Sequence, residues 1–234
     1  TAMKFRNVLI VALLCASAHQ LRAQNVGLSF SYFLPKHGDF STPISPFSLR
    51  GVGVDINRFL ALETGATLYR MTGMGMTGLP FQYDHSMVGP NFTAFVPAEL
   101  VLQLKGKSAQ LDLKAGGFGF YGFNQHLITG NWDRAVRSWK GWDVANGDLS
   151  FSNHPGYGWQ AGIELTVEIS RQFGLSFEVN YLAGQAKLPV RGSYTGGVVG
   201  GTLMTIPADF NTGKIDFTGL EFSIGVMTLG GGRR

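Results

Sequence analysis

Three short segments carry residue types that could do chemistry. Asp84-His85-Ser86 and Ser152-Asn153-His154 contain the serine, histidine and acid types of a hydrolase triad. Gly117 to Gly122 fits the G-x-G-x-x-G spacing of a dinucleotide-binding turn, but it lies within an expected strand and opens no helix. Because His and Ser are ordinary polar loop residues and no Cys/His cluster has metal-ligand spacing, we expect no catalytic residues, no cofactor and no metal. The chain is therefore predicted not to be an enzyme.

The segment 124–155 combines aromatic and basic residues in a pattern that could bind a partner. Three tryptophans alternate there with three bases: Trp132, Arg134, Arg137, Trp139, Lys140 and Trp142. Trp and Arg are enriched at binding hot spots, so one interpretation is an exposed surface for a protein, a glycan or a lipopolysaccharide phosphate. The alternative is that the tryptophans pack the segment onto the protein and anchor it at the level of lipid headgroups.

Several segments alternate apolar residues with small or charged ones, and their acidic residues recur at every second position. In Tyr157 to Lys187, Trp159, Ile163 and similar apolar residues alternate with small or charged ones, and the alternation resumes after the turn 171–174. Such alternation is typical of β-strands. These strands run to about twelve residues, as tilted membrane-crossing strands require. An apolar face and a small or charged face match a transmembrane β-barrel with lipid outside and a polar interior.

Eight such strands can be counted along the chain. Their approximate ranges are 26–34, 46–56, 60–71, 92–104, 110–123, 157–170, 175–187 and 215–229. The parity breaks at Leu49-Arg50, which predicts a bulge or a register shift, and Pro97 interrupts the ladder of its strand. The fold expected is an all-β, eight-stranded, antiparallel, up-and-down transmembrane β-barrel.

The inward parity predicts a polar network in the lumen. Its members are Asp55, Glu63, Glu99, Asp112, Lys114, Glu164, Glu178 and Glu221. Arg50 and Arg70 would join them if the register slips near their strand ends. An eight-stranded barrel is just wide enough to be filled by its own side chains, so we interpret the network as a plug. A cation or proton site is the alternative, because acids outnumber bases.

Connections of alternating length set the topology. Residues 57–59, 105–109 and 171–174 form short turns, whereas 35–45, 72–90, 124–155 and 188–214 form long loops. Outer-membrane barrels have short periplasmic turns and long extracellular loops, which predicts both termini on the periplasmic side. A soluble lipocalin-like barrel would turn apolar side chains inward, and here the inward parity carries the carboxylates.

The N-terminal residues read as an export signal. Lys4 and Arg6 precede an apolar run, and small residues permit cleavage after Ala18 or Ala23. We thus expect a cleaved signal peptide at 1–23 and a barrel domain at 24–234. The single cysteine, Cys15, lies in the signal, so disulfides are not expected. The signal holds three bases and no acid, so the formal charge falls from +4 to +1 without it, which argues against nucleic-acid binding.

On these features the chain resembles small outer-membrane β-barrels of the OmpX, OmpW and OmpA-barrel kind, and its Ala23-Gln24 junction resembles exported proteins of Bacteroidota. The resemblance implies a bacterial outer-membrane location and contact with membrane lipid or lipopolysaccharide. The leading functional interpretation is a non-enzymatic surface or interaction protein, which could join a protein partner as a subunit of a larger outer-membrane complex. The first alternative is a narrow conduit for small or apolar solutes, and the second, more distant one is a lipid-modifying barrel hydrolase.

Overall fold

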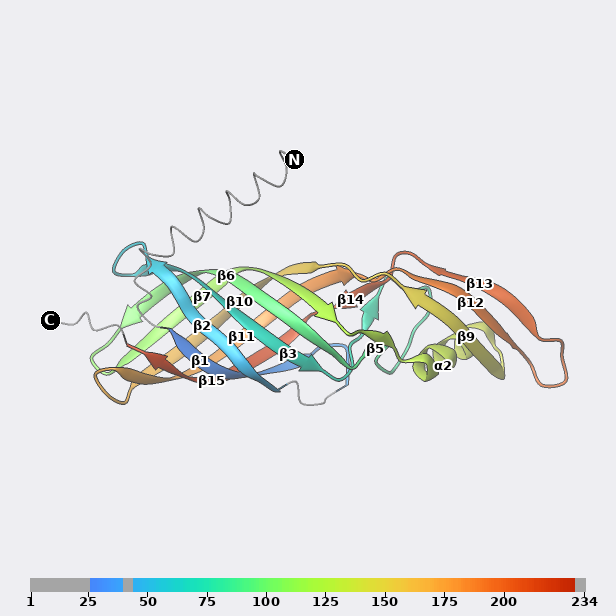
Figure 1. Ribbon diagram of the computed structural model, residues 1–234, viewed down its shortest axis with the longest axis horizontal. Helices are drawn as coiled ribbons and strands as arrows, with labels where there is room; N and C mark the ends of the chain where they lie inside the picture. Colours follow the sequence, from blue (N-terminus) through green and yellow to red (C-terminus); the bar gives the residue numbers. More distant parts are fainter. Residues whose placement is uncertain (1–25, 40–43, 230–234) are drawn as a thin grey trace, which may run out of the picture.

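The protein is a closed barrel with an elongated extension at one end (Figure 1). The computed structural model describes residues 26–39 and 44–229, so the expected signal peptide lies outside the described residues. The barrel wall contains eight strands: β1 (Gly27–Pro35), β2 (Ile44–Asp55), β3 (Leu60–Met71), β6 (Asn91–Lys105), β7 (Ala109–Phe123), β10 (Gly156–Glu168), β11 (Phe173–Lys187) and β15 (Gly219–Thr228).

Each wall strand pairs antiparallel with the next one along the chain, and β1 pairs with β15 to close the cylinder. The expected eight-stranded up-and-down barrel is therefore confirmed. Closure leaves the wall without an edge strand on which another chain could add.

Burial alternates along the wall strands, as the sequence predicted. In β6 every second side chain is buried, and the intervening Val96, Leu100 and Leu102 are exposed on the outer face. The outer faces of β1, β10, β11 and β15 carry the same kind of apolar residue, among them Phe30, Ile163 and Phe222. A continuous exposed apolar wall of this size is unfavourable in water and favourable in lipid. The barrel has the architecture of a transmembrane β-barrel.

The parity break in β2 is a real irregularity. The pairing with β3 shifts between Leu49 and Val52, and Gly51 takes a positive φ of 70° that favours glycine. The irregularity turns Arg50 into the lumen and leaves Leu49 on the outer face. Arg70 behaves differently: it is exposed at the end of β3 and does not join the interior.

Three of the four expected long loops contain regular structure instead of irregular chain. Together they form the extension, which comprises β4 (Met76–Thr77), β5 (Val88–Gly89), β8 (His126–Leu127), α2 (Thr129–Lys140), β9 (Val144–Phe151), β12 (Val190–Gly197), β13 (Met204–Phe210) and β14 (Lys214–Asp216). Strands β13, β12 and β9 form a three-stranded sheet, and α2 packs beside β9 (Figure 1). Strand β14 joins the extension to the barrel by pairing with both β11 and β4.

One hydrophobic core runs from the extension into the barrel. It includes Trp132 of α2, Phe210 of β13, Met76 of β4 and the lumenal Phe33 and Phe217. The shared core packs the extension against the interior of the barrel. Among the described residues, no helix has the length and apolarity required to cross a membrane.

Candidate functional site

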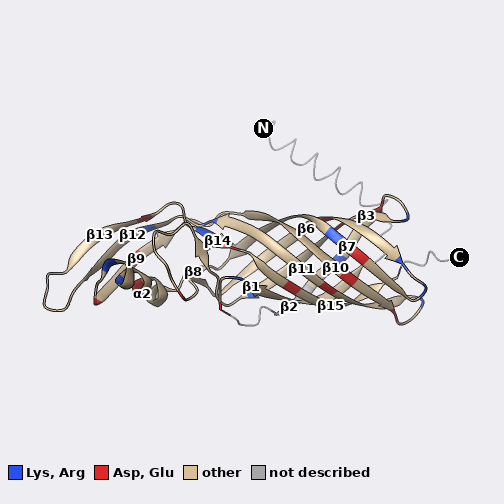
Figure 2. Ribbon diagram, turned by 180° about the vertical axis from the view of Figure 1, so that it is seen from behind, with Lys and Arg blue, Asp and Glu red and all other residues tan. Residues whose placement is uncertain are grey.

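A layer of charged side chains fills part of the barrel interior. The strand register sets Glu63 opposite Glu99, and Glu164 opposite both Asp112 and Glu178. Figure 2 shows acidic and basic positions next to each other on the barrel wall at β7 and β10. Because like charges directly opposite one another destabilise a sheet, this layer requires cations.

Lys114 and Arg50 supply those cations from β7 and β2. The Nζ of Lys114 lies 2.5 Å from Oε2 of Glu164 and 3.3 Å from Oε1 of Glu178. Lys114 also lies 3.6 Å from Oε2 of Glu63. Arg50 pairs with Glu221 and lies 3.5 Å from Glu178. Glu178 therefore bridges the two cations, and the ion pairs tie opposite parts of the wall together across the lumen.

Side-chain amides satisfy further carboxylate oxygens in this layer. Gln160 donates to Glu99 over 2.6 Å, and Asn180 donates to Glu178 over 3.1 Å and to Glu221 over 3.0 Å. Six carboxylates still share two cations. Nevertheless, in residues 26–39 and 44–229 no group of three or more His, Cys, Asp or Glu side chains is placed to hold a metal ion.

The structure places seven of the eight network residues expected from the sequence in or beside this layer. They are Glu63, Glu99, Asp112, Lys114, Glu164, Glu178 and Glu221. Asp55 differs, because it is exposed at the end of β2. It has the inward parity but lies at the mouth of the barrel, where the lumen is open to solvent. Arg50, considered only in case of a register slip, is a central member.

A second lumenal layer, toward the extension, is aromatic. It consists of Phe33, Tyr69, Phe95, Phe118, Phe120 and Phe217, all of them buried. Phe217 stacks on Phe33 and on Phe120, with ring centroids 4.6 Å apart in both pairs. Tyr69 links the two layers by donating its hydroxyl to Glu221 over 2.6 Å. The expectation of a polar interior is thus right for one layer and wrong for the other.

The aromatic and basic residues of 124–155 do not form one exposed surface. Trp132 is 0% exposed, and its indole N–H donates to the carbonyl of Met87 over 2.9 Å. Trp142 is half-buried against the core. Trp139 is 41% exposed, and Lys140 lies 3.8 Å above its ring. The expected binding surface is therefore wrong for Trp132, which packs α2 onto the extension as the alternative interpretation predicted.

Arg134 and Lys140 are exposed and Arg137 is half-buried, so three bases do remain at the surface of α2. Arg137 reaches the carbonyl of Asp143 at 3.5 Å, close to the end of the helix. These bases make the outer face of α2 a polar face that contacts water, whereas the inner face of the helix packs on the core.

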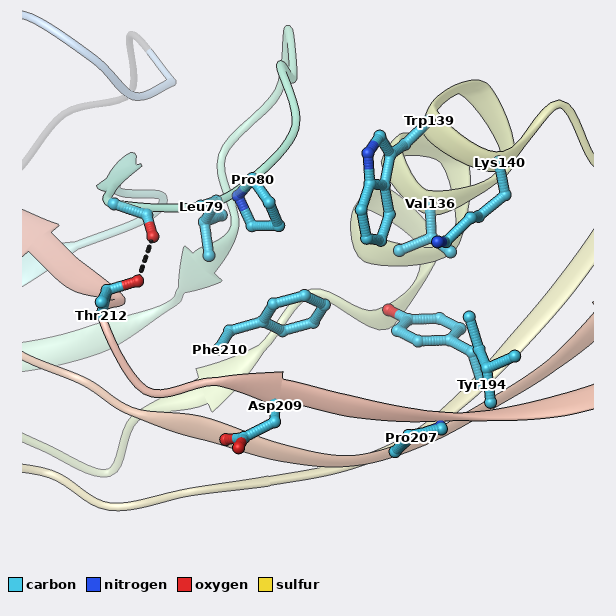
Figure 3. A pocket seen from close by; sticks show the side chains of 12 residues that line it. Leu79, Pro80, Val136, Trp139, Lys140, Tyr194, Pro207, Asp209, Phe210 and Thr212 are labelled. Carbon is cyan, nitrogen blue, oxygen red and sulfur yellow. Dashed lines mark hydrogen bonds between the residues drawn. The ribbon is translucent and has the colours of Figure 1, made fainter.

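Beside this helix lies a cavity of about 500 Å³, here called the extension pocket (Figure 3). Its apolar lining comes from Leu79, Pro80, Val136, Trp139, Tyr194, Ile206, Pro207 and Phe210. Lys140, Asp209 and Thr212 add polar groups, and Thr212 donates to the carbonyl of Gly78 over 2.7 Å. The lining is thus mixed, with apolar side chains beside charged and polar ones, and the space is large enough for a small molecule. Of its lining residues, only Trp139 and Lys140 were expected from the sequence to bind a partner.

The hydrolase-like segments are not assembled into a triad. Asp84 and His85 are exposed, whereas Ser86 is buried and accepts a hydrogen bond from the backbone of Asp39 over 2.8 Å. Asn153 donates to the carbonyl of Gly122. Within the described ranges, no hydrogen bond joins a histidine to a serine. Gly117 to Gly122 lies inside β7, as expected, so it opens no helix on which a dinucleotide could rest.

Comparisons with known proteins support the fold. No protein-family model and no curated protein sequence matches the chain. Among solved structures, the outer membrane protein OprG from Pseudomonas aeruginosa matches with a TM-score of 0.52 and 12% identity, covering 87% of this chain and 93% of that one. Ail, the attachment invasion locus protein of Yersinia pestis, matches with a TM-score of 0.37, 9% identity and coverages of 87% and 94%. The chain has the fold of a small eight-stranded outer-membrane β-barrel.

Proposed function

We propose that this protein is an outer-membrane barrel that captures small, predominantly apolar solutes in the extension pocket. The apolar outer wall supports a place in the membrane, with lipid as the partner of residues such as Phe30 and Ile163. The three short turns lie at the end opposite the extension. Because outer-membrane barrels place their longer connections outside the cell, the extension faces the exterior and the termini face the periplasm.

The observation that carries this proposal is the continuity between the pocket and the core. Phe210 lines the pocket, and its ring lies 5.4 Å from that of Phe81 and 5.6 Å from that of Trp132. The same apolar cluster continues to Phe217 in the lumen. An apolar solute that contacts Phe210 in the pocket therefore exchanges water for the edge of this apolar cluster, which favours its capture.

The lumen itself does not suit an axial passage. Beyond the aromatic layer a solute would meet the buried ion pairs of Lys114 and Arg50. Separating buried ion pairs leaves uncompensated charges, which costs several kcal/mol. No chemical conversion of the solute is proposed.

The test is equilibrium binding of 2-isopropenylnaphthalene to the protein in lipid nanodiscs, with empty nanodiscs measuring partition into lipid. Ile206 lines the pocket, so Ile206→Trp should fill it and weaken binding at least about tenfold. The matched control is Ile224→Trp, which adds the same ring to an apolar groove on the lipid-facing wall. Loss of binding in the control but not in Ile206→Trp would place the solute on the wall and refute the proposal.

A surface-interaction role is the second candidate, favoured by the tip of the β12–β13 hairpin. Val199 is 82% exposed and Leu203 is 59% exposed, beside exposed Val198 and Met204. Exposed apolar patches often mark contacts with other macromolecules. A photo-crosslinking residue at position 199, in cells, should yield a stoichiometric protein adduct. Recovery of uncrosslinked protein alone would remove the support for this candidate.

A further inference from the structure

The hydroxyl group of Tyr194 is a buried polar group that the fold leaves without a partner. Tyr194 lies in β12, and its side chain is 1% exposed. No hydrogen bond of its Oη exists among the described residues. A buried hydroxyl without a hydrogen bond has lost its contacts with water and gained none in return, so buried hydroxyls in proteins are usually paired. This one requires a specific explanation.

Tyr194 is one of the residues that line the extension pocket, and its Oη is itself covered. In Figure 3 the ring of Tyr194 lies below Val136, and its oxygen is directed toward Phe210. Gly147 of the neighbouring strand β9 makes room for the ring, because a Cβ at that position would lie 2.7 Å from it. The ring is thus fixed in place by close backbone contact, with its polar end at the apolar lining.

The surroundings keep this hydroxyl a donor. Burial raises the pKa of Tyr194, and the carboxylate of Asp133 raises it further. One oxygen of Asp133 is already engaged, since it accepts the backbone N–H of Gly147 over 3.0 Å. A neutral tyrosine hydroxyl can donate one hydrogen bond. The pocket lining therefore holds one fixed neutral donor, covered in this structure, beside the charged groups of Lys140 and Asp209.

We propose that the extension pocket selects solutes that combine an apolar body with one hydrogen-bond acceptor, such as a ketone, aldehyde or ester, and that the Tyr194 hydroxyl donates to this acceptor. The inference rests on the proposed function, because it assigns the ligand class of the same pocket. An acceptor on the solute satisfies the buried hydroxyl, whereas a hydrocarbon of the same shape leaves it unpaired. Discrimination between such pairs is strongest where the protein group is otherwise unsatisfied.

The experiment compares two nearly isosteric probes, 2-acetylnaphthalene and 2-isopropenylnaphthalene, which differ by a carbonyl oxygen in place of a methylene. Binding of both is measured by equilibrium dialysis against the full chain in nanodiscs, for the wild type and for Tyr194→Phe. The control is Tyr157→Phe, a tyrosine 80% exposed on the outer wall. If the Tyr194 hydroxyl donates a hydrogen bond to the ketone, losing that bond in Tyr194→Phe should weaken ketone binding about two- to tenfold. The alkene should bind both proteins equally or bind the variant more tightly.

Each other outcome decides a separate question. If Tyr194→Phe changes neither probe, or weakens both equally, the hydroxyl does not recognise an acceptor, and the inference is overturned while the proposed function stands. If neither probe binds the wild type above empty nanodiscs, the proposed function itself fails. If Tyr157→Phe reproduces the selective loss, the ketone binds at the wall and the inference is likewise wrong.

Discussion

Lys114 is the residue on which the charged layer depends most. Its ammonium group has three carboxylate neighbours within 3.6 Å, from three different wall strands. A lysine suits this position because its compact charge on a flexible stem can face several acceptors at once, whereas a guanidinium favours a planar pair. The layer thus holds strands together through one side chain as well as through backbone ladders.

Lys114→Met should destabilise the barrel strongly. The change keeps an apolar stem of similar length but removes the positive charge that neutralises Glu164 and Glu178. Leaving such buried carboxylates without their partner lowers the free energy of unfolding by about 3–5 kcal/mol. We expect a lower midpoint of urea unfolding. The midpoint is measured from the fraction of protein that keeps the gel mobility of the folded barrel. Lys187→Met, at an exposed position of β11, is the control and should leave the midpoint unchanged. The double change Lys114→Met with Glu164→Gln should recover part of the loss.

The alternation of inward and outward positions along the strands predicted most residues of the charged layer, and the exceptions have physical causes. Asp55 shares the parity but lies beyond the closed part of the lumen, and Arg50 enters only because of the irregularity at Gly51. The aromatic layer was missed although Phe95 and Phe118 lie on the same inward parity as the acids. Alternation assigns a side chain to a face, but it does not say which polarity fills each level of the lumen.

At the scale of elements, the aromatic layer depends on small residues in the strands beside it. The ring of Phe118, from β7, lies over Gly184 of β11, where an added Cβ would be 2.6 Å from the ring. Large and small residues thus alternate around the lumen, as close packing in a narrow barrel requires.

Gly184→Ala should therefore destabilise the wall by about 1–3 kcal/mol, the usual cost of overpacking. Gly117→Ala is the matched control, because a Cβ at that outward position would meet its nearest atom at an ordinary 3.5 Å. Thermal unfolding monitored by circular dichroism measures both. Combining Gly184→Ala with Phe118→Leu should restore part of the stability. If both alanine variants unfolded at the same temperature, the ring would not be the cause.

Helix α2 and the three-stranded sheet of β9, β12 and β13 lie in segments for which the sequence predicted only loops. The buried helix residues Trp132, Ala135 and Val136 have the i, i+3, i+4 spacing of an amphipathic helix. That signal was present in the sequence, but the alternation of tryptophans with bases was interpreted as a surface. The eight wall strands were found because each is long and regular, whereas β4, β5, β8 and β14 have two or three residues each. Elements so short carry no readable period and depend on long-range pairing.

Trp132→Ala should unfold the extension without unfolding the wall. It removes the largest fully buried side chain and its hydrogen bond to Met87, a loss of about 3–5 kcal/mol. Limited proteolysis should then cleave within 124–155 while the barrel keeps its folded gel mobility. Trp139→Ala, at a half-exposed position, should stay resistant to the protease. Equal cleavage of both variants would contradict the role assigned to Trp132.

At the scale of the whole molecule, the barrel is filled at two successive levels, and the pocket lies outside both. The charged layer and the aromatic layer share Tyr69, and the aromatic layer joins the core of the extension through Phe217. The pocket itself combines residues from 78–80, 136–140 and 194–212, which are far apart in the sequence. Only the folded structure brings these segments together, so no local pattern could have predicted the site.

This arrangement predicts that the protein binds apolar solutes without conducting ions. An ion in the axis would have to pass the aromatic layer around Phe217, where it loses water and gains no polar partner, at a large cost in free energy. Single-channel recording in planar bilayers should therefore show no steps for the wild type, and none for Phe217→Ala, because the ion pairs of Lys114 remain below. A general porin added to the same bilayer confirms that channels would be detected. Steps in the wild type that disappear with Lys114→Met would instead make the charged layer a selectivity site and favour the axial conduit.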